Sequence, residues 1–494
     1  MTITETSLLL PFIGGESYGT PGRGSFTSIN PADGTSAAEI VLCGVAEIDA
    51  AVAAARDAQP RWAALAPAQR ADALIAWGDL IVQHAEEVAM LDVTDMGKVI
   101  ADARGEMLFA RRMTRYWAGM ADKVWGDQIP ITPGHLSYTI REPIGVSAVI
   151  LPWNGPAIMF VSRVSTALAF GNSVVLKPSE FSPQSALRLA ELAVEAGIPA
   201  GVINVVPGDG ETGHALVSHA DVAGVNFTGS VPTGRAIATA AAPSFKKVVL
   251  ELGGKAPSIV FEDAILDDAL RGSIWGIFQN AGQVCCASTR LLVQESIADE
   301  VTQRLADLAR KVRVGHPLDT SAHIGPLVSA QHQERVLRYI DIATDDGGSV
   351  VAGGGRIADA PDQGGYYVSP TVVAGLNPDA RVASDEIFGP VLSVLTFRDE
   401  QEAIAMANAT EFGLSANVWT SDSARMMRAA EAIEAGVIWG NTARVMDPGL
   451  GFAGFKSSGT GYATGREAIE GMTRVKRVTL RYGANTPTAS WPDV

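Results

Sequence analysis

Hydrophobic residues in the first quarter of the chain recur every three or four positions. Residues 45–120 are rich in alanine, and the spacing is clearest in residues 50–56 and 71–87. Such spacing gathers apolar side chains on one face of a helix, so this region is predicted to be helical. The residues before it, including the run from Pro31 to Gly34, favour turns.

From Gly145 onward, short apolar runs alternate with amphipathic stretches. Buried strands are predicted at residues 146–151, 173–176, 202–206 and 222–227. Helices are predicted between and after them, at residues 183–196, 210–218 and 232–241. This alternation is typical of a parallel sheet whose strands are joined by crossover helices, and it predicts an α/β fold.

A second alternating region begins near Leu252. Strands are predicted at residues 258–261 and 290–294, and helices at residues 266–280 and 297–312. Residues 473–481 are also predicted to form a strand, but no partner lies near them in the sequence. Pairing with a neighbouring subunit is therefore one explanation for this last strand.

Composition and charge exclude two classes of partner. Of the 494 residues, 47% are hydrophobic and 19% are charged. This is ordinary for a globular chain, and the length suggests about three domain-sized units. The 54 acidic residues outnumber the 38 Lys and Arg residues, which gives a formal charge of −16. Nucleic acids and anionic membranes bind clustered positive charge, so neither partner is expected.

The cysteines and the chain's first residues bear on location. Cys43, Cys285 and Cys286 are the three cysteines, and because two are adjacent they cannot build a conventional disulfide framework. The first residues lack the basic stretch of a secretory signal, and no run of about 18 apolar residues occurs. We expect a cytoplasmic protein, and no metal site is predicted.

Three polar side chains stand where predicted elements end. Cys285 follows a helical pattern, Glu251 ends an apolar strand before two glycines, and Asn154 follows a strand among turn-forming residues. They could act as a nucleophile, a general base and a donor to an oxyanion. Each also has a purely structural explanation, as a small buried thiol, a salt-bridged acid and a helix cap.

Two further windows suit a nucleotide. Lys177 and Glu180 lie just beyond a predicted strand, and ligands of open α/β sheets bind at the carboxyl ends of the strands. Residues 227–234 follow another strand and open a helix, where free N–H groups suit a phosphate. This segment is not the Gly-x-Gly-x-x-Gly fingerprint, so on its own it is a weak signal.

Together these windows resemble the aldehyde dehydrogenase superfamily of the NAD(P)-dependent, hydrolytic type. The resemblance extends from Arg141-Glu-Pro-Ile-Gly to Gly454-Phe-Lys-Ser-Ser-Gly and includes Leu250-Glu-Leu-Gly-Gly-Lys, Gly282-Gln-Val-Cys and Glu386-Ile-Phe-Gly-Pro. A chance match to so many motifs in this order is implausible. The resemblance implies that Cys285 is the nucleophile, with Cys286 as a bystander.

The resemblance assigns further roles. Glu251 would be the general base and Asn154 the oxyanion donor. The residues that would hold the cofactor are Trp153, Lys177, Glu180, Gly229, Ser230, Gly234, Glu386 and Phe388. A carboxylate at Glu180 would repel the 2′-phosphate of NADP, so NAD is expected, although NADP stays open because some relatives with this glutamate use both.

The resemblance also implies an aldehyde dehydrogenase-like α/β fold in three parts. A Rossmann-like NAD-binding domain would comprise residues 1–120 and 142–252, and an α/β catalytic domain residues 253–457. A β-arm of residues 121–141 and 470–485 would bridge subunits of a homodimer or homotetramer. The arm would give the strand at residues 473–481 a partner within the chain.

In such an enzyme the aldehyde forms a thiohemiacetal and then a thioester on Cys285, and Glu251 activates the water that hydrolyses it. Members that pass the acyl group to coenzyme A generally lack this glutamate, so hydrolysis is expected and acylation of coenzyme A is an alternative. A non-catalytic member of the fold is disfavoured because Cys285 and Glu251 are both present.

The expected substrate depends on the tunnel lining. Many relatives carry an aromatic residue after the oxyanion asparagine, whereas this chain has Gly155, which should widen the tunnel. With the apolar Met159, Met446 and Phe452, this favours a bulky or aromatic aldehyde. Arg444 near the tunnel mouth supports the alternative, a semialdehyde whose carboxylate binds the arginine.

Overall fold

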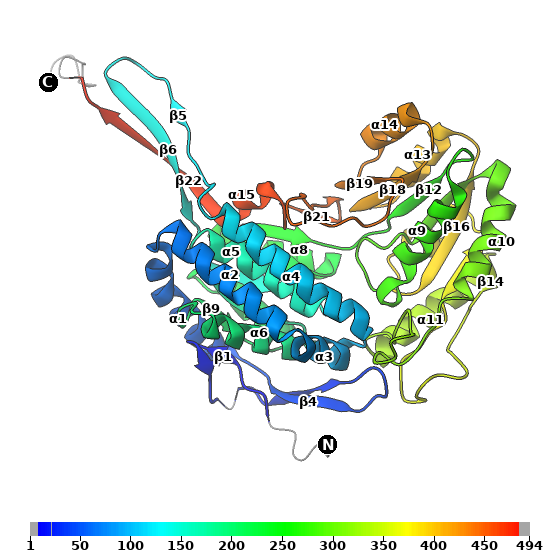
Figure 1. The fold of residues 1–494 in the computed structure, drawn as a ribbon, viewed down its shortest axis with the longest axis horizontal. Coiled ribbons are helices and arrows are strands. Elements are labelled where there is room, and N and C mark those ends of the chain that lie inside the picture. The colour runs from blue at the N-terminus through cyan, green and yellow to red at the C-terminus, as the bar shows by residue number, and fades with distance from the viewer. Residues whose placement is uncertain (1–7, 21, 484–494) are drawn as a thin grey trace.

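Two sheets, each flanked by helices, form the body of the protein, and a thin arm projects from it (Figure 1). The computed structural model describes residues 8–20 and 22–483. The eight-stranded sheet has the order β2 (Glu16–Ser17), β1 (Phe12–Ile13), β9 (Ile203–Val205), β8 (Ser173–Lys177), β7 (Val146–Ile150), β10 (Val222–Thr228), β11 (Lys247–Glu251) and β21 (Gly459–Thr460). Its strands from β9 to β11 are parallel, as the alternating pattern predicts.

Helices cover both faces of this sheet. One buried cluster contains Trp62, Trp77 and Trp117 and joins the sheet to helices on one side, and a second cluster joins it to helices on the other side. The helices are α1 (Val45–Ala63), α2 (Pro67–Gln83), α3 (Ala85–Met96), α4 (Ile100–Met120), α5 (Pro156–Ala169), α6 (Gln184–Glu195), α7 (Gly210–Ser218) and α8 (Val231–Ala241). The resulting core fixes the carboxyl ends of β7, β10 and β11 beside one another.

The seven-stranded sheet is built from later residues. Its order is β14 (Ser349–Ala352), β15 (Thr371–Ala374), β16 (Val391–Phe397), β13 (Arg290–Gln294), β12 (Pro257–Val260), β18 (Ser415–Trp419) and β19 (Val437–Gly440). Only the β14–β15 pair is antiparallel among these described strands. Its helices are α9 (Leu266–Phe278), α10 (Ala298–Ala309), α11 (Ala330–Asp345), α12 (Arg381–Ser384), α13 (Glu400–Asn408) and α14 (Ser423–Ala432). A separate buried cluster holds this part together.

The arm is a three-stranded sheet that extends away from both bodies (Figure 1). Its order is β22 (Thr473–Arg481), β6 (His135–Pro143) and β5 (Gln128–Ile129), and β22 runs antiparallel to β6 over its whole length. The last strand therefore pairs within the chain, and a neighbouring subunit is not needed to explain it. At the base of the arm, Lys247 Nζ donates to the carbonyls of Glu470 and Thr473, each at 2.6 Å.

The structure corrects some sequence predictions. The helix predicted over residues 266–280 ends at Phe278, because Asn280 and Ala281 both have a left-handed φ of 54°. The helical region 45–120 is four helices, and one break falls at Gly97, whose φ is +75°. The turn-rich first residues also contain a hairpin that the sequence did not predict, β3 (Ser25–Ile29) with β4 (Ser36–Val41).

The remaining described elements are short. They are β17 (Phe412–Gly413), which pairs with β20 (Phe455–Lys456), and α15 (Ile469–Met472), which leads into the arm. Of the predicted domain segments, residues 1–7, 21 and 484–485 lie outside the described residues. Within the part of the chain that the structure describes, no helix is long and apolar enough to cross a membrane.

Candidate active site

Two cavities meet at Cys285. One has a volume of about 460 Å³ and the other about 550 Å³, and both are lined by Asn154, Met159, Thr228 and Cys285. Each volume lies in the range of small-molecule and cofactor sites. Side chains from the eight-stranded sheet and from the second body line each cavity, so the sulfur of Cys285 faces two compartments at the contact between the two bodies.

The loop before Cys285 is held in an unusual conformation. Asn280 and Ala281 adopt the left-handed region, which costs energy for residues other than glycine. The buried Gln283 amide compensates, because its Nε2 donates to the Asn280 carbonyl at 3.1 Å and its Oε1 accepts from the Val328 amide at 2.9 Å. Because of this conformation, the chain stops following α9 before it reaches Cys285.

Asn154 is tied to the same loop. It lies just after β7 at the carboxyl edge of the sheet, it is buried, and its Nδ2 donates to the Gln283 carbonyl at 2.9 Å. The Asn280 side chain donates in turn to the main-chain carbonyl of Asn154 at 3.1 Å. An amide nitrogen carries two hydrogens, so one remains for a ligand oxygen in the cavity.

Glu251 ends β11 and lines the 550 Å³ cavity with Cys285. Within the described residues, neither of its buried carboxyl oxygens has a hydrogen-bond partner. Burial raises the pKa of Glu251 to about 8, and the positive charge of Arg163 opposes that rise. A carboxyl with a pKa close to neutral pH can both accept and release a proton, which suits a general base.

Arg163 is a site residue that the sequence patterns did not reveal. It lies on α5, is buried and lines the same cavity as Glu251. Its Nη1 donates to the Ala463 carbonyl at 3.1 Å and its Nη2 to Thr228 Oγ1 at 3.3 Å. The sequence signal was a single charged residue inside an otherwise uncharged helix.

The two adjacent thiols differ. The contact with Cys286, burial and the nearby Glu251 carboxylate raise the pKa of Cys285 above its usual range. The same contact, together with the guanidinium of Arg444, lowers the pKa of Cys286. Cys285 lines both cavities whereas Cys286 lines only the larger one. A protonated Cys285 requires a base before it can attack, since the thiolate is the nucleophile.

Aromatic rings close one side of the 460 Å³ cavity. Trp153 and Phe388 line it and meet edge to face, with 5.3 Å between ring centroids. Phe388 has a left-handed φ of 64°, and its carbonyl accepts from His332 Nε2 at 2.7 Å. Burial lowers the pKa of His332 to about 4, so this ring is neutral. His332 on α11 thus supports the conformation of Phe388, a role that nothing in the sequence indicated.

Glu386 is fixed in the same cavity. Its Oε1 accepts from the Gly254 amide at 3.0 Å, and a Cβ on the adjacent Gly253 would collide with its carboxylate. Arg335 and Tyr339 of α11 also line the cavity, and Arg335 Nη2 donates to the Glu386 carbonyl at 2.7 Å. Sequence patterns missed both, because their positions on the helix reveal nothing of the cavity formed by distant segments.

The other residues predicted to bind the cofactor do not all line the 460 Å³ cavity. Gly229 and Ser230 line the 460 Å³ cavity at the start of α8. Lys177 does not, since its Nζ donates to the carbonyls of Pro178 and Gly208 at 2.8 and 2.6 Å. Glu180 lies 3.9 Å from that Nζ and lines a separate cavity of about 360 Å³. A Cβ on Gly234 would come within 2.6 Å of Leu252 Cδ2, so close packing explains that glycine, and its cofactor role stays a prediction.

All five predicted substrate residues line the 550 Å³ cavity: Gly155, Met159, Arg444, Met446 and Phe452. A Cβ on Gly155 would lie 3.3 Å from Ile158 Cγ2, which is a tight contact, and 3.7 Å from Met159 Cε, so a side chain at this position would press on Ile158. Among the described residues, no group of His, Cys, Asp and Glu side chains could hold a metal ion.

Comparison with known proteins agrees with this geometry. The sequence model of the aldehyde dehydrogenase family matches residues 19–478. The crystal structure of PnpE from Pseudomonas sp. WBC-3 is similar, with 43% identity over 97% of this chain and 99% of that chain and a TM-score of 0.95. An NAD⁺ complex of aldehyde dehydrogenase from Bacillus cereus has 39% identity over 97% of each chain and a TM-score of 0.94. An indole-3-acetaldehyde dehydrogenase in complex with NAD⁺ has 41% identity over 96% of each chain and a TM-score of 0.93.

The chain belongs to the aldehyde dehydrogenase family. It is an NAD(P)-dependent aldehyde dehydrogenase with that family's mixed α/β fold, which confirms the resemblance found in the sequence.

Proposed function

We propose that this enzyme oxidises a bulky or aromatic aldehyde to the carboxylic acid with NAD, through a thioester on Cys285. The observation that carries the proposal is the position of Cys285, which lines both cavities. A nucleophile at such a junction can bind an aldehyde from one side while a nicotinamide ring approaches from the other. The two reacting groups are then held in one geometry without competing for space.

The residues around Cys285 supply the other steps. Once the Cys285 thiol has lost its proton to water, the thiolate adds to the aldehyde carbonyl to give a thiohemiacetal alkoxide. The free amide hydrogen of Asn154 and the Cys285 main-chain amide stabilise that negative charge. The NAD ring, when bound, accepts the hydride that leaves the carbon. Glu251 then accepts a proton from the water that attacks the thioester. The bond between the acyl carbon and the Cys285 sulfur breaks, and the acid is released.

The cofactor cavity fits a dinucleotide. Glu386 presents a half-buried carboxylate for a ribose, and the start of α8 presents Gly229 and Ser230 for a pyrophosphate. Glu180 is exposed near Lys177, where a carboxylate would hydrogen-bond an adenosine ribose and repel a 2′-phosphate. PnpE and the Bacillus cereus enzyme were both solved with NAD, which supports the choice of NAD over NADP.

Hydrolysis is favoured over transfer of the acyl group to coenzyme A. Glu251 lies in the same cavity as Cys285, and its carboxyl oxygens have no other partner within the described residues. A base in this position would promote hydrolysis of the thioester before coenzyme A could accept the acyl group. The expected product is therefore the free acid.

The size of the substrate follows from Gly155. The cavity of about 550 Å³ is lined by the apolar Met159, Met446 and Phe452, and no aromatic side chain follows Asn154 to fill it. One similar structure is named as an indole-3-acetaldehyde dehydrogenase, an enzyme whose substrate carries a bulky aromatic ring. This supports a bulky or aromatic aldehyde for the present chain.

Three sequence predictions are carried forward as proposals. These are the division into a cofactor domain, a catalytic domain and an arm, assembly as a homodimer or homotetramer, and a cytoplasmic location. The separate clusters of buried side chains in the two bodies support the first. The arm that projects from the body (Figure 1) supports the second.

Steady-state NADH formation across a panel of aldehydes tests the proposal. We expect turnover of benzaldehyde and phenylacetaldehyde, faster with NAD than with NADP at equal concentration, and an acid product without coenzyme A. Cys285→Ala is the control for nonenzymatic oxidation. Turnover that depends on added coenzyme A would contradict the hydrolytic mechanism, and a preference for short aliphatic aldehydes would contradict the substrate size.

A further inference from the structure

Three cationic side chains line the 550 Å³ cavity. They are Lys98, Arg163 and Arg444. Lys98 is neutralised by Glu106, since its Nζ donates to both carboxylate oxygens at 2.6 and 2.7 Å. Arg163 donates to two oxygens near Glu251. Arg163 Nε has no partner among the described residues, whereas Arg444 lacks a partner at both Nε and Nη1.

Arg444 has donors without acceptors. Its Nε and Nη1 are buried, and within residues 8–20 and 22–483 neither has a hydrogen-bond partner. The guanidinium interacts with the Cys286 sulfur and lowers the pKa of that thiol, but Nε and Nη1 still have no hydrogen-bond partner. Leaving guanidinium hydrogens buried and unpaired is costly, and the cavity they face is the place from which a partner could come.

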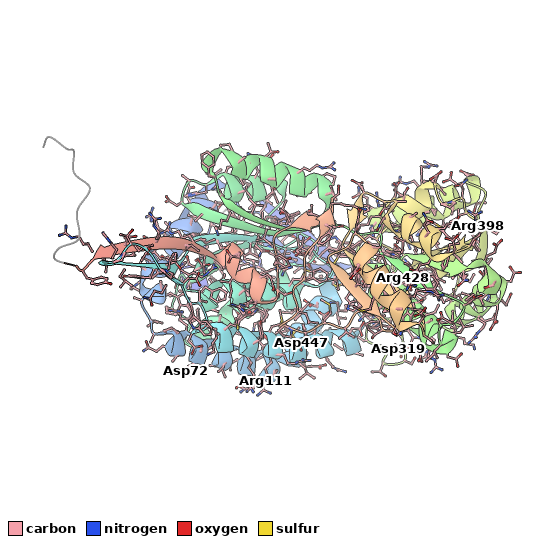
Figure 2. All side chains as sticks on the ribbon, turned by 90° about the horizontal axis from the view of Figure 1, so that it is seen from above. Asp72, Arg111, Asp319, Arg398, Arg428 and Asp447 are labelled. Carbon is pink, nitrogen blue, oxygen red and sulfur yellow. The ribbon has the colours of Figure 1, made fainter. Side chains whose placement is uncertain are left out.

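The arginine is held in place. Its guanidinium carbon lies 4.8 Å from the centroid of the Trp275 ring, a cation–π contact. The segment that follows it is anchored, because Trp439 Nε1 donates to the Val445 carbonyl at 3.2 Å and Arg112 Nη2 to Asp447 Oδ2 at 2.7 Å. Figure 2 shows Asp447 on the side of the molecule where Arg111 of α4 lies. A fixed guanidinium binds a planar anion more favourably than a mobile one.

The cavity between Arg444 and Cys285 has aromatic walls. Phe109, Trp275 and Phe452 line it, and Gly155 leaves room beside them. Flat faces of this kind favour a planar, conjugated body over a flexible alkyl chain. Asp102 also lines the cavity. Its Oδ2 accepts from Gln279 Nε2 at 3.1 Å, burial raises its pKa, and the charges of Lys98 and Arg444 oppose that rise.

We propose that the substrate is an aromatic or conjugated aldehyde with a second, anionic carboxylate group, and that Arg444 binds this carboxylate against the face of Trp275. The proposal rests on the proposed function and narrows its substrate class. It joins the size argument from Gly155 with the charge argument from Arg444, which the sequence left as alternatives. A bidentate pair between a guanidinium and a carboxylate would satisfy both orphaned donors.

The test compares 4-carboxybenzaldehyde with benzaldehyde, which differ only in the distal group. We expect wild-type kcat/KM to favour 4-carboxybenzaldehyde, and Arg444→Met to lower that preference by about ten- to a hundredfold, the effect of losing a charged hydrogen-bonded pair. The kcat/KM for benzaldehyde, measured in each variant, is the reference from which the preference is calculated. Arg444→Lys should retain part of the preference, because it keeps the charge and loses the planar fork.

A matched variant on the same wall is Asp102→Asn. It removes a charge of the opposite sign, so it should not lower the preference for 4-carboxybenzaldehyde. Two further substrates can contradict the proposal. Faster turnover of 4-(aminomethyl)benzaldehyde than of 4-carboxybenzaldehyde would mean that the cavity binds a cation. Faster turnover of succinic semialdehyde would mean that the substrate need not be planar. An equal preference in the wild type and in Arg444→Met would overturn the role of Arg444.

Binding without turnover separates this proposal from the proposed function. In Cys285→Ala, calorimetry with 4-carboxybenzaldehyde should show binding that Arg444→Met weakens by about the same factor as kcat/KM. If no aldehyde yields NADH but this binding difference is present, the function is wrong and the carboxylate site stands. If NADH forms and the binding difference is absent, the function stands and the carboxylate site is wrong.

Discussion

The side-chain amide of Asn154 donates a hydrogen bond to the main-chain carbonyl of Gln283, with 2.9 Å between the two atoms. Gln283 is two residues before Cys285, so the bond links the expected oxyanion donor to the segment that presents the nucleophile. The second amide hydrogen is thereby pointed in a fixed direction. A donor fixed in this way needs no reorganisation when negative charge develops on the substrate oxygen.

Asn154→Ala should lower kcat about a hundredfold, corresponding to about 3 kcal/mol, because it removes one donor to the alkoxide. NAD affinity should change little, since Trp153, Glu386 and Phe388 remain in place. Stopped-flow measurement of NADH formation and a separate NAD titration check this. An unchanged kcat would mean that Asn154 only holds the loop.

The two adjacent cysteines should behave differently. Cys285→Ala is expected to abolish turnover while leaving folding and NAD binding nearly intact, whereas Cys286→Ala should keep substantial activity. The reason is that Cys285 lines both cavities and Cys286 only the larger one. Steady-state assays of both variants test this prediction, with thermal unfolding as a control for folding. The reverse pattern would mean that Cys286 is the nucleophile.

Glu251→Gln should give one rapid burst of NADH and then stall. The acyl-enzyme can form once a thiolate is available, but no carboxylate remains to activate water. Mass spectrometry of the stalled enzyme should find the acyl group on Cys285. Undiminished steady-state turnover in this variant would rule out the general-base role.

The deacylation rate should rise with pH through about 8. Burial raises the pKa of Glu251 to about 8, so the carboxyl is largely protonated at lower pH and becomes a base only above it. Arg163 opposes this rise, so Arg163→Met should move the profile to higher pH by about one unit. Arg163→Lys keeps the charge and serves as the control. A profile that stays at the same pH in Arg163→Met would show that Arg163 does not act on Glu251.

Gly155→Phe should narrow the substrate cavity selectively. Its φ of −156° lies outside the left-handed region that favours glycine, and the new side chain would press on Ile158 and Met159. Overpacking commonly costs about 1–3 kcal/mol, so bulky aldehydes should lose about ten- to a hundredfold in kcat/KM. Propanal should be much less affected. The ratio of kcat/KM for benzaldehyde to that for propanal is the measurement, and an unchanged ratio would remove Gly155 from substrate selection.

The sequence predicted the strands and helices around the site well, because burial imposes a periodic pattern on them. The strand that ends at Glu251 and the strand before Asn154 both stand out as apolar runs interrupted by one polar residue. The five residues predicted to contact the substrate all line the 550 Å³ cavity, and their role stays a prediction. The hairpin of β3 and β4 escaped prediction because its strands are half-exposed and follow turn-forming residues.

Features that depend on distant contacts could not be predicted in the same way. Arg163, His332 and Arg335 lie on helices, and only tertiary packing brings them to the cavities. The left-handed pair at Asn280 and Ala281 is stabilised by the Gln283 side chain, a contact with no sequence signature. Long-range hydrogen bonds, rather than local propensity, decide these conformations.

The pairing of β21 with β11 determines when the site can form during synthesis. Glu251 lies opposite Gly459 in that pair. The strand β22 completes the arm by pairing with β6, which is synthesised some 300 residues earlier. Proteins are synthesised from the N-terminus, so β11 is made with one edge unpaired. That edge has no partner strand until the last tenth of the polypeptide has been synthesised. A nascent chain that stops before Gly459 would carry every residue of the nucleophile and base, yet it would lack the strand that closes the sheet beside them. Activity in this enzyme is therefore a property of the finished chain, and truncated translation products should be inert.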